Sequence, residues 1–228
     1  MIQLTNLSFS YKDNTILENI NIQFETKQIH GIVGLNGSGK TTLFNILTGL
    51  HQQRDGTIEH KSLPLKKSDI AYIDTETFFY PDVTAQEFLS VFKTTNAQFD
   101  EKGLADLLKL PLDEFIENYS TGMKKKLLIL SQIKQDKSIY IFDEPFNGLD
   151  IETNKLLLLI IEMLVRKGKT IFMSSHIIEP LYALCYKIHH LKDKQFVKSY
   201  SKTEFDIVDQ EVFGNYIENL RTSLNKFY

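Results

Sequence analysis

The sequence predicts one α/β domain built on a mainly parallel sheet, with an antiparallel β subdomain at the N-terminus and an inserted, shortened helical subdomain. Short apolar strands alternate with helical stretches, and one strand runs directly into a glycine-rich turn. A mostly helical segment then interrupts the alternation. Strands that alternate with helices form largely parallel sheets covered by helices. With 228 residues, 42% of them hydrophobic, the chain can bury one sizeable core.

The N-terminal third predicts strands followed by a glycine loop. Residues 2–11 partly alternate apolar and polar side chains, and residues 20–24 repeat the pattern, which is typical of half-buried strands. The predicted strand Ile29–Val33 leads into the glycine-rich residues 34–39. Residues 40–50 then carry Leu and Ile at helical spacing. The order is therefore strand, glycine loop, helix.

The rest of the core predicts two more buried strands and a helix. Ile139–Phe142 is a short apolar run that suits a central strand. Residues 155–166 form a leucine-rich helical pattern, closed by Gly168 as a C-terminal cap. Residues 170–173 form the next strand. We expect the core to comprise residues 1–76 and 134–200, the helical subdomain residues 77–133, and a helical tail residues 201–228.

The tail carries an amphipathic helical pattern. One face of residues 213–227 would present Phe213, Tyr216, Ile217, Leu220, Leu224 and Phe227. A helix packed on the body of the domain is the favoured interpretation. The alternative is a contact with a partner or with a second subunit.

Composition excludes several classes of protein. The formal net charge is −3, from 26 basic and 29 acidic residues, so no basic field suggests a nucleic-acid partner. The single cysteine, Cys185, cannot form an internal disulfide. The N-terminus lacks the pattern of a signal peptide, and the most apolar run, residues 156–165, falls short of the about 20 residues that span a bilayer. We expect any membrane role to require a partner.

Residues 34–41 fit the pattern G-x-x-x-x-G-K-[ST], the Walker A motif of P-loop nucleotide triphosphatases with a RecA-like core. Glycines let successive backbone N–H groups point at phosphate oxygens, and the following helix adds its positive N-terminal end. Lys40 would reach the β- and γ-phosphates of ATP, and the Thr41 hydroxyl would bind Mg²⁺. The predicted nucleotide-binding residues are Gly34, Asn36, Gly37, Ser38, Gly39, Lys40, Thr41 and Thr42.

Two carboxylates follow the strand Ile139–Phe142. Asp143, at the strand tip, would hold Mg²⁺, as in a Walker B motif. Glu144 would face the γ-phosphate and orient or deprotonate the attacking water. A pair of acids after a strand is usually a solvated strand end, but beside a phosphate loop the functional interpretation is favoured. Lys40 and Glu144 are thus predicted catalytic residues.

At this point the sequence resembles the ATP-binding subunits of ABC transporters over residues 1 to about 200. Residues 118–126, Asn-Tyr-Ser-Thr-Gly-Met-Lys-Lys-Lys, look like the family's signature, and residues 143–150 look like a Walker B running into the D-loop. Ser174-Ser175-His176 looks like the switch histidine, and Tyr11 sits where the family has an aromatic residue that stacks on adenine.

The resemblance implies a Mg²⁺-dependent ATPase that works as a head-to-tail dimer. Each ATP would lie between Walker A of one subunit and the signature of the other. Ser120 and Gly122 would hold the γ-phosphate of the ATP bound to the second ABC ATPase subunit, in a homodimer or a heterodimer. His176 would be catalytic, contacting the γ-phosphate, and Asp150 would communicate across the interface. The dimer would power an integral membrane permease subunit, from the cytoplasmic, inner face of the cell membrane.

The chain departs from the family pattern in three places. Asp74-Thr75-Glu76-Thr77 stands where the family has its Q-loop glutamine; Thr75 aligns with that glutamine, and Glu76 is a candidate metal ligand. The signature has Thr121 in place of a glycine. The helical insertion between Pro81 and Ser120 is short. This variant looks most like ATPase subunits of small bacterial two-component exporters.

Two other functions compete with transport. The first is a soluble, non-transport ABC ATPase that acts on a ribosome, DNA or an assembly scaffold. The second is a nucleotide-binding regulator without turnover, against which the retention of Lys40, Asp143, Glu144 and His176 argues. The sequence does not identify the transported substrate.

Overall fold

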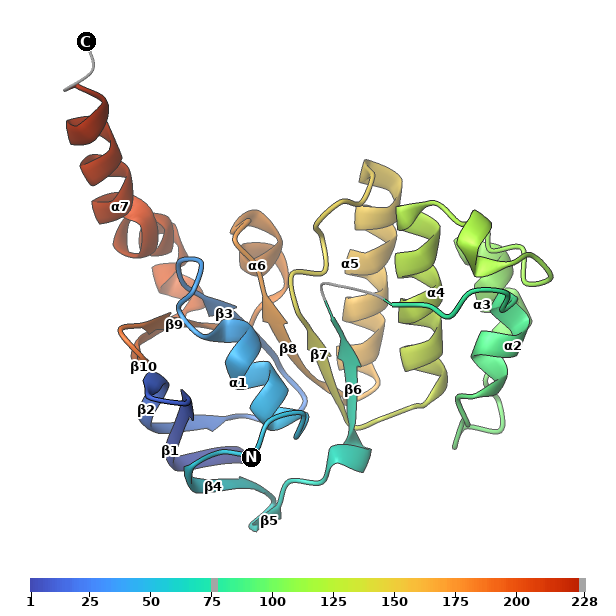
Figure 1. The fold of residues 1–228 in the computed structure, drawn as a ribbon, viewed down its shortest axis with the longest axis horizontal. Helices are drawn as coiled ribbons and strands as arrows, with labels where there is room; N and C mark the ends of the chain where they lie inside the picture. The colour runs from blue at the N-terminus through green and yellow to red at the C-terminus, as the bar shows by residue number, and fades with distance from the viewer. Residues whose placement is uncertain (75–77, 226–228) are drawn as a thin grey trace.

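The computed structural model describes residues 1–74 and 78–225 (Figure 1). Its N-terminal part forms a four-stranded antiparallel sheet in the order β2-β1-β4-β5. The strands are β1 (Ile2–Tyr11), β2 (Asn14–Phe24), β4 (Asp55–His60) and β5 (Leu63–Pro64). The predicted antiparallel N-terminal subdomain is therefore confirmed.

A six-stranded sheet forms the centre of the molecule, in the order β10-β9-β3-β8-β7-β6. All neighbouring pairs are parallel except β9 and β10. The strands are β3 (Ile29–Val33), β6 (Ile70–Ile73), β7 (Ile139–Phe142), β8 (Thr170–Ser174), β9 (Lys187–Lys192) and β10 (Gln195–Ser201). The mainly parallel sheet predicted from the sequence is confirmed.

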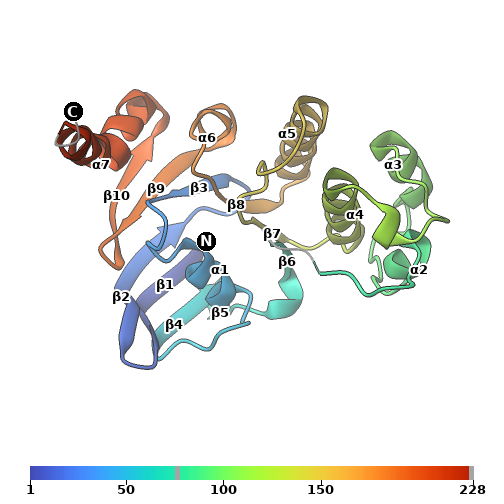
Figure 2. The same ribbon diagram turned by 45° about the horizontal axis from the view of Figure 1, so that its top comes forward.

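The helices occupy both faces of this sheet, because successive residues of a strand point to opposite sides. On one face α1 (Lys40–Leu47) lies between the two sheets, where Ile139 and Ile141 meet its Leu43 and Phe44 (Figure 2). On the other face Tyr140 and Phe142 pack in a larger cluster with α4 (Thr121–Lys134), α5 (Ile151–Arg166) and α6 (Glu179–Leu184).

The segment between β6 and β7 is mostly helical, as the sequence predicts. It contains α2 (Ala85–Ser90), α3 (Glu101–Leu108) and α4. Helix α2 begins with a capping box, in which the Thr84 hydroxyl accepts from the Glu87 backbone N–H and the Glu87 carboxylate accepts from Thr84 N–H. Single 3₁₀ turns lie at η1 (Lys67–Asp69), η2 (Ile116–Asn118) and η3 (Lys202–Ile207).

Two helix boundaries differ from the sequence-based expectation. Helix α1 ends at Leu47 rather than Leu50, where Gly49 takes a positive φ of 68°. Helix α5 begins at Ile151, four residues before the leucine-rich pattern, because the Asp150 carboxylate caps it by accepting from Thr153 N–H at 2.8 Å.

The favoured interpretation of the C-terminal tail is wrong for most of its length. Helix α7 (Val208–Leu224) is held to the body at its base, where Val208 and Val212 are buried, and then projects away from it (Figure 1). Tyr216, Ile217, Leu220 and Leu224 are 50%, 41%, 45% and 59% exposed. Beyond its base the helix shares a hollow of about 1020 Å³ with β9 and β10, which Ile217 and Arg221 line. Phe227 lies outside the described residues.

None of the helices within residues 1–74 and 78–225 combines the length and the apolar character needed to cross a membrane.

Candidate functional site

The glycine loop between β3 and α1 adopts a conformation that depends on its glycines. Gly37 and Gly39 have positive φ angles of 81° and 103°, which suit glycine. A Cβ at Gly34 would overlap the backbone oxygen of Leu191, so a side chain has no room there. The loop ends at Gly39, and α1 begins at Lys40, which directs the N-terminal N–H groups of the helix toward the loop. The hydroxyl of Ser38 is buried without a hydrogen-bond partner among the described residues.

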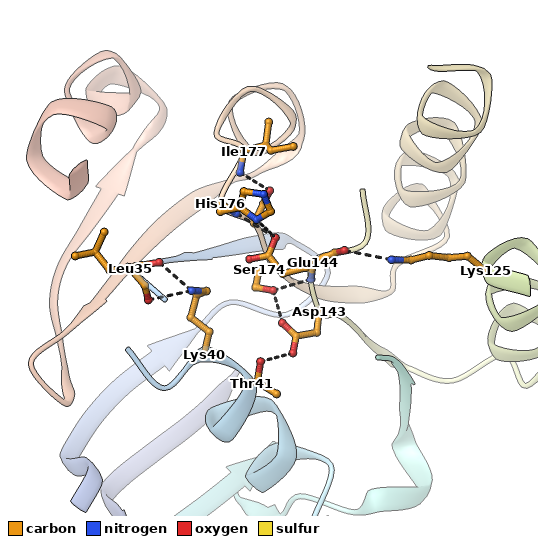
Figure 3. A network of polar contacts seen from close by, with 11 residues as sticks. Leu35, Lys40, Thr41, Lys125, Asp143, Glu144, Ser174, His176 and Ile177 are labelled. Atoms are coloured by element: carbon orange, nitrogen blue, oxygen red, sulfur yellow. Dashed lines mark hydrogen bonds and ion pairs between the residues drawn. The ribbon is translucent and has the colours of Figure 1, made fainter. Parts of the chain in front are cut away.

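Lys40 folds back over this loop. Its ammonium donates to the backbone oxygens of Gly34 at 2.8 Å and Leu35 at 3.3 Å, and the residue is only 7% exposed (Figure 3). Burial lowers the pKa of Lys40, an effect that the nearby carboxylates of Glu144 and Asp143 oppose. A phosphate anion at the loop would stabilise the charged ammonium in the same way.

Asp143, at the end of β7, is completely buried and held by hydrogen bonds on both carboxylate oxygens. Thr41 Oγ1 donates to Oδ2 at 2.6 Å, and Ser174 Oγ donates to Oδ1 at 2.5 Å (Figure 3). Tyr72, on β6, approaches the same carboxylate at 3.5 Å, and burial and this negative charge raise the pKa of its hydroxyl. The two residues predicted to hold Mg²⁺, Thr41 and Asp143, are therefore in direct contact.

Glu144 and His176 form a second pair, next to Asp143. The Glu144 carboxylate accepts from the backbone N–H of His176 at 3.1 Å, and its Oε2 lies 2.8 Å from His176 Nδ1. Glu144 has a positive φ of 47°, and its own N–H donates to Ser174 Oγ at 2.8 Å. The strand ends of β7 and β8 thus place the predicted base beside the predicted switch histidine (Figure 3).

A cavity of about 450 Å³ connects these groups. It is lined by Ile16, Asn36, Gly37, Gly39, Lys40, Thr41, Thr42, Asp143 and Glu144. The lining gathers phosphate-loop residues, a buried lysine and both carboxylates around one space. Such a cavity suits a polyanion with a metal ion, because backbone N–H groups and an ammonium meet the negative charge while oxygen ligands meet the cation.

Tyr11, predicted to stack on adenine, lies outside this cavity lining. It stands at the end of β1, where its hydroxyl lies 2.8 Å from His51 Nε2 and its ring meets Phe9 edge to face at 4.8 Å. It is 44% exposed, so one face is open to a ligand. The adenine contact stays a prediction.

The signature residues lie apart from this chain's own phosphate loop, at the start of α4 (Figure 1). Ser120 caps the helix by accepting from Met123 N–H at 3.2 Å, and a Cβ at Gly122 would lie 3.9 Å from the Ser120 hydroxyl. The Asp150 carboxylate lies near Gly122, about 4.0 Å from where a Cβ would be. Contact of Ser120 and Gly122 with nucleotide therefore requires another subunit. Thr75 and Glu76 lie outside the described residues, so the metal role of Glu76 stays a prediction.

Three residues of the site escaped sequence reasoning. Ser174 bonds both Asp143 and Glu144, although a serine after a strand is a weak signal. Lys125, 6% exposed on α4, donates to the Glu144 backbone oxygen at 3.2 Å and so connects the signature helix to the predicted base. Ile16 lines the cavity from β2. The lysine run after the signature could have pointed to Lys125.

The fold and this site define a P-loop nucleotide triphosphatase: a mainly parallel sheet, a glycine loop leading from β3 into α1, and a buried acid on β7 that contacts the loop's threonine.

The comparisons with known proteins are more specific. The ABC transporter family model matches residues 17–147. A putative ABC transporter ATP-binding protein of Listeria monocytogenes is 32% identical over 216 residues, 85% of this chain and 79% of that protein. The lantibiotic transport ATP-binding protein SrtF of Streptococcus pyogenes is 31% identical and covers 85% of this chain and 84% of its own. A solved ATP-binding subunit of an ABC transporter superposes with a TM-score of 0.81 at 24% identity, over 99% of both chains.

The chain belongs to the ABC transporter family and is an ATP-binding ATPase of that family. The resemblance noted in the sequence is confirmed, as is the fold class.

Proposed function

We propose that this chain hydrolyses ATP at the site between the glycine loop and the ends of β7 and β8, and so powers export through a separate membrane subunit. The observation that carries the proposal is the fixed position of Asp143 between Thr41 and Ser174, with Glu144 beside it at the mouth of the cavity. The names of similar proteins support transport, since one is a lantibiotic and another a bacitracin transport ATP-binding protein.

The residues present fit Mg²⁺. The Thr41 hydroxyl and Asp143 carboxylate oxygens are 2.6 Å apart, and oxygen ligands are what Mg²⁺ requires. No cluster of three His, Cys, Asp or Glu side chains is found within the described residues, so Thr41 and Asp143 would hold the ion together with phosphate oxygens and water. When bound, the ion would neutralise charge on the β- and γ-phosphates.

The chain's own groups supply the rest of the chemistry. Lys40 would leave the backbone oxygens of Gly34 and Leu35 and donate to the β- and γ-phosphates. The Glu144 carboxylate would accept a proton from a water molecule while the water oxygen attacks the γ-phosphorus, and ADP would leave. His176 Nδ1 lies 2.8 Å from Glu144 Oε2, a contact that orients the carboxylate. The imidazole would contact the γ-phosphate from this position.

A second ABC ATPase subunit would complete the site. Ser120, Gly122 and the N-terminus of α4 form an anion-binding group that does not line the chain's own cavity. In a head-to-tail dimer, the signature of each subunit would close over the ATP of the other. Among the solved structures, the fold is shared by an ATP-binding cassette crystallised as a dimer with ADP and phosphate.

The membrane subunit would dock on the helical side of the molecule, which would place the chain on the cytoplasmic, inner face of the cell membrane. Phe78, Tyr80 and Val91 are 77%, 73% and 75% exposed, and the rings of Phe78 and Tyr80 pack edge to face at 5.3 Å. Exposed apolar groups of this size often mark an interaction surface. They follow β6, where the family has its Q-loop.

The test is the Glu144→Gln variant, purified beside the unchanged protein. We expect the variant to bind ATP, to lose hydrolysis by at least 100-fold, and to form a stable dimer with ATP and Mg²⁺. Turnover and oligomeric state that match the unchanged protein would refute the role of Glu144.

The membrane partner is tested by affinity purification from gently solubilised membranes. Recovery of an integral membrane protein of several spans, weakened by the Phe78→Ala/Tyr80→Ala pair, would support transport. Recovery of ribosomes or a soluble scaffold instead would contradict it and leave the ATPase assignment intact.

A further inference from the structure

Helix α7 carries an apolar stripe that stays about half exposed within the part of the chain that the structure describes. Tyr216, Ile217, Leu220 and Leu224 lie along one side of the helix, and each is between 41% and 59% exposed. A stripe of four large apolar side chains on one exposed helix is the pattern of a helix that packs against something else.

The base of the helix is firmly held, so its direction is set by the fold. Val208 and Val212 are buried in the main core cluster. Glu211 accepts from Lys198 Nζ at 2.9 Å and from the Tyr200 hydroxyl at 2.8 Å, both on β10. These contacts orient α7, and beyond them Ile217 and Arg221 line a hollow of about 1020 Å³ between the helix and strands β9 and β10.

The helix projects past the face of the molecule that carries the nucleotide site. In Figure 1 the glycine loop, the ends of β7 and β8 and the start of α4 all lie at the top of the molecule, and α7 extends beyond them. Figure 2, turned to bring that face forward, shows α7 close to end-on. A second subunit that covers the nucleotide face would therefore come close to α7.

One residue of the stripe, Tyr216, also lies next to the nucleotide site. Tyr216 lines a hollow of about 410 Å³ together with Leu35, Asn36, Gly37 and Ser38 of the glycine loop, and Ile16 belongs to both this hollow and the phosphate cavity. The stripe thus begins at the edge of the surface on which, in the proposed dimer, the second subunit would place its signature.

We propose that the exposed stripe of α7 is an interaction surface for a second copy of this chain. The stripe would contact that copy beside its signature helix, α4, when ATP closes the dimer. The proposal rests on the head-to-tail dimer of the proposed function. The contact of α7 would be an additional dimer interface outside the nucleotide sites, formed only in the closed dimer.

The first experiment measures dimerisation of full-length Glu144→Gln protein with ATP and Mg²⁺ by analytical ultracentrifugation. Adding Leu220→Glu places a charge in the stripe, and we expect the dimer dissociation constant to rise at least 10-fold. Thr222→Glu adds the same charge on a different side of α7 and is the matched control, with an expected change below 2-fold. Circular dichroism of both variants checks that helix content is unchanged.

The second experiment locates the contact. A photo-crosslinking amino acid at Leu220 should give an ATP-dependent crosslink between two subunits that maps to residues 117–134, and the same group at Thr222 should not. A crosslink confined to one chain, or one whose yield ignores ATP, would overturn the proposal.

The outcomes separate the two levels of inference. If Glu144→Gln forms the ATP-dependent dimer but Leu220→Glu leaves the dimer dissociation constant unchanged, the proposed dimer contact of α7 is wrong and the proposed function stands. If Leu220→Glu instead weakens only recovery of the membrane subunit, the stripe belongs to that protein and the proposal is overturned. If Glu144→Gln does not dimerise at all, both fail together.

Discussion

Replacing Ser174 with alanine tests whether the two carboxylates of the site are positioned by one hydroxyl. Ser174 Oγ donates to Asp143 Oδ1 at 2.5 Å and accepts from the backbone N–H of Glu144 at 2.8 Å. Ser174 is completely buried. Alanine removes both hydrogen bonds, keeps the strand and adds no bulk.

The expected cost follows from the two bonds. A hydrogen bond to a charged group contributes about 1.5–3 kcal/mol, and a buried donor left without a partner costs about 1–3 kcal/mol. Because water can reach part of the site through the cavity, we expect a combined loss near the low end, about 3 kcal/mol in the free energy of unfolding. For a chain of this size that corresponds to a fall of roughly 6–12 °C in Tm. Turnover should fall on the order of 100-fold, because Glu144 loses the bond that fixes its backbone.

The assay compares Ser174→Ala with Ser175→Ala by thermal unfolding and steady-state ATP hydrolysis. Ser175 is the matched control because it is also buried, at 2% exposed, and its hydroxyl also accepts from a backbone N–H, that of Ile177 at 2.9 Å. The Ser175 hydroxyl does not contact the Asp143 or Glu144 carboxylate. Ser175→Ala should lose stability by about 1 kcal/mol with turnover within 3-fold of the unchanged protein. Equal turnover in the two variants would refute the argument that Ser174 positions the site.

Three further predictions follow from the structure. Gly34→Ala should weaken binding of a fluorescent ATP analogue at least 10-fold, because a Cβ there overlaps the oxygen of Leu191 and the loop must shift; binding within 2-fold would contradict this. Lys125→Met keeps the bulk but removes the donor to Glu144 O, and should lower turnover about 10-fold with the ATP dissociation constant nearly unchanged. Burial lowers the pKa of His189 to about 3, so below its ordinary value of 6.5 the unfolded chain takes up a proton that the folded chain does not. The contribution of His189 to the free energy of unfolding should therefore fall by about 1.4 kcal/mol per pH unit from pH 6.5 toward pH 3, and it should be constant above pH 6.5. Urea unfolding at pH 7 and pH 5 should show a smaller difference in His189→Asn.

The strands and the glycine loop could be predicted because local pattern and tertiary environment agree there. Ile139–Phe142 is a short apolar run, and Ile29–Val33 leads directly into the glycine loop. Both are buried central strands with the predicted ends. The phosphate loop could be predicted equally well, because the spacing of its glycines and lysine is set by the geometry of a backbone that wraps around phosphate. In these segments the residue types have few alternative structures.

The tail shows where this agreement ends. The apolar periodicity of residues 213–227 predicts a helix, and α7 is one. Periodicity does not state which surface covers the apolar face, and the six-stranded sheet ends at β10 before it can do so. Burial was therefore wrongly expected for Tyr216, Leu220 and Leu224, which are 50%, 45% and 59% exposed.

The contacts of Ser174 and Lys125 were beyond sequence reasoning for a different reason. Both act through bonds between segments distant in the chain: Ser174 reaches across from β8 to β7, and Lys125 reaches from α4. Neither residue type is specific to such a role, so only the three-dimensional register reveals it. By contrast, Thr41 and Asp143 were paired correctly, because a phosphate loop and an acidic strand end must meet at the same edge of a parallel sheet.

The bond from Lys125 has a consequence for how the signature and the site of one subunit communicate. Lys125 lies one turn into the helix that Ser120 caps, and burial lowers its pKa while the charges of Glu144 and Asp143 oppose that effect. A movement of α4 that follows phosphate binding at Ser120 would therefore pull on the backbone of Glu144 through a charged donor at 3.2 Å. Because the Glu144 N–H is held at the same time by Ser174, the backbone on the two sides of the Glu144 Cα would respond differently, and the direction of the carboxylate would change. In the proposed dimer, binding of nucleotide to the signature of a subunit would in this way alter Glu144 of the same subunit, the proposed base for the other ATP.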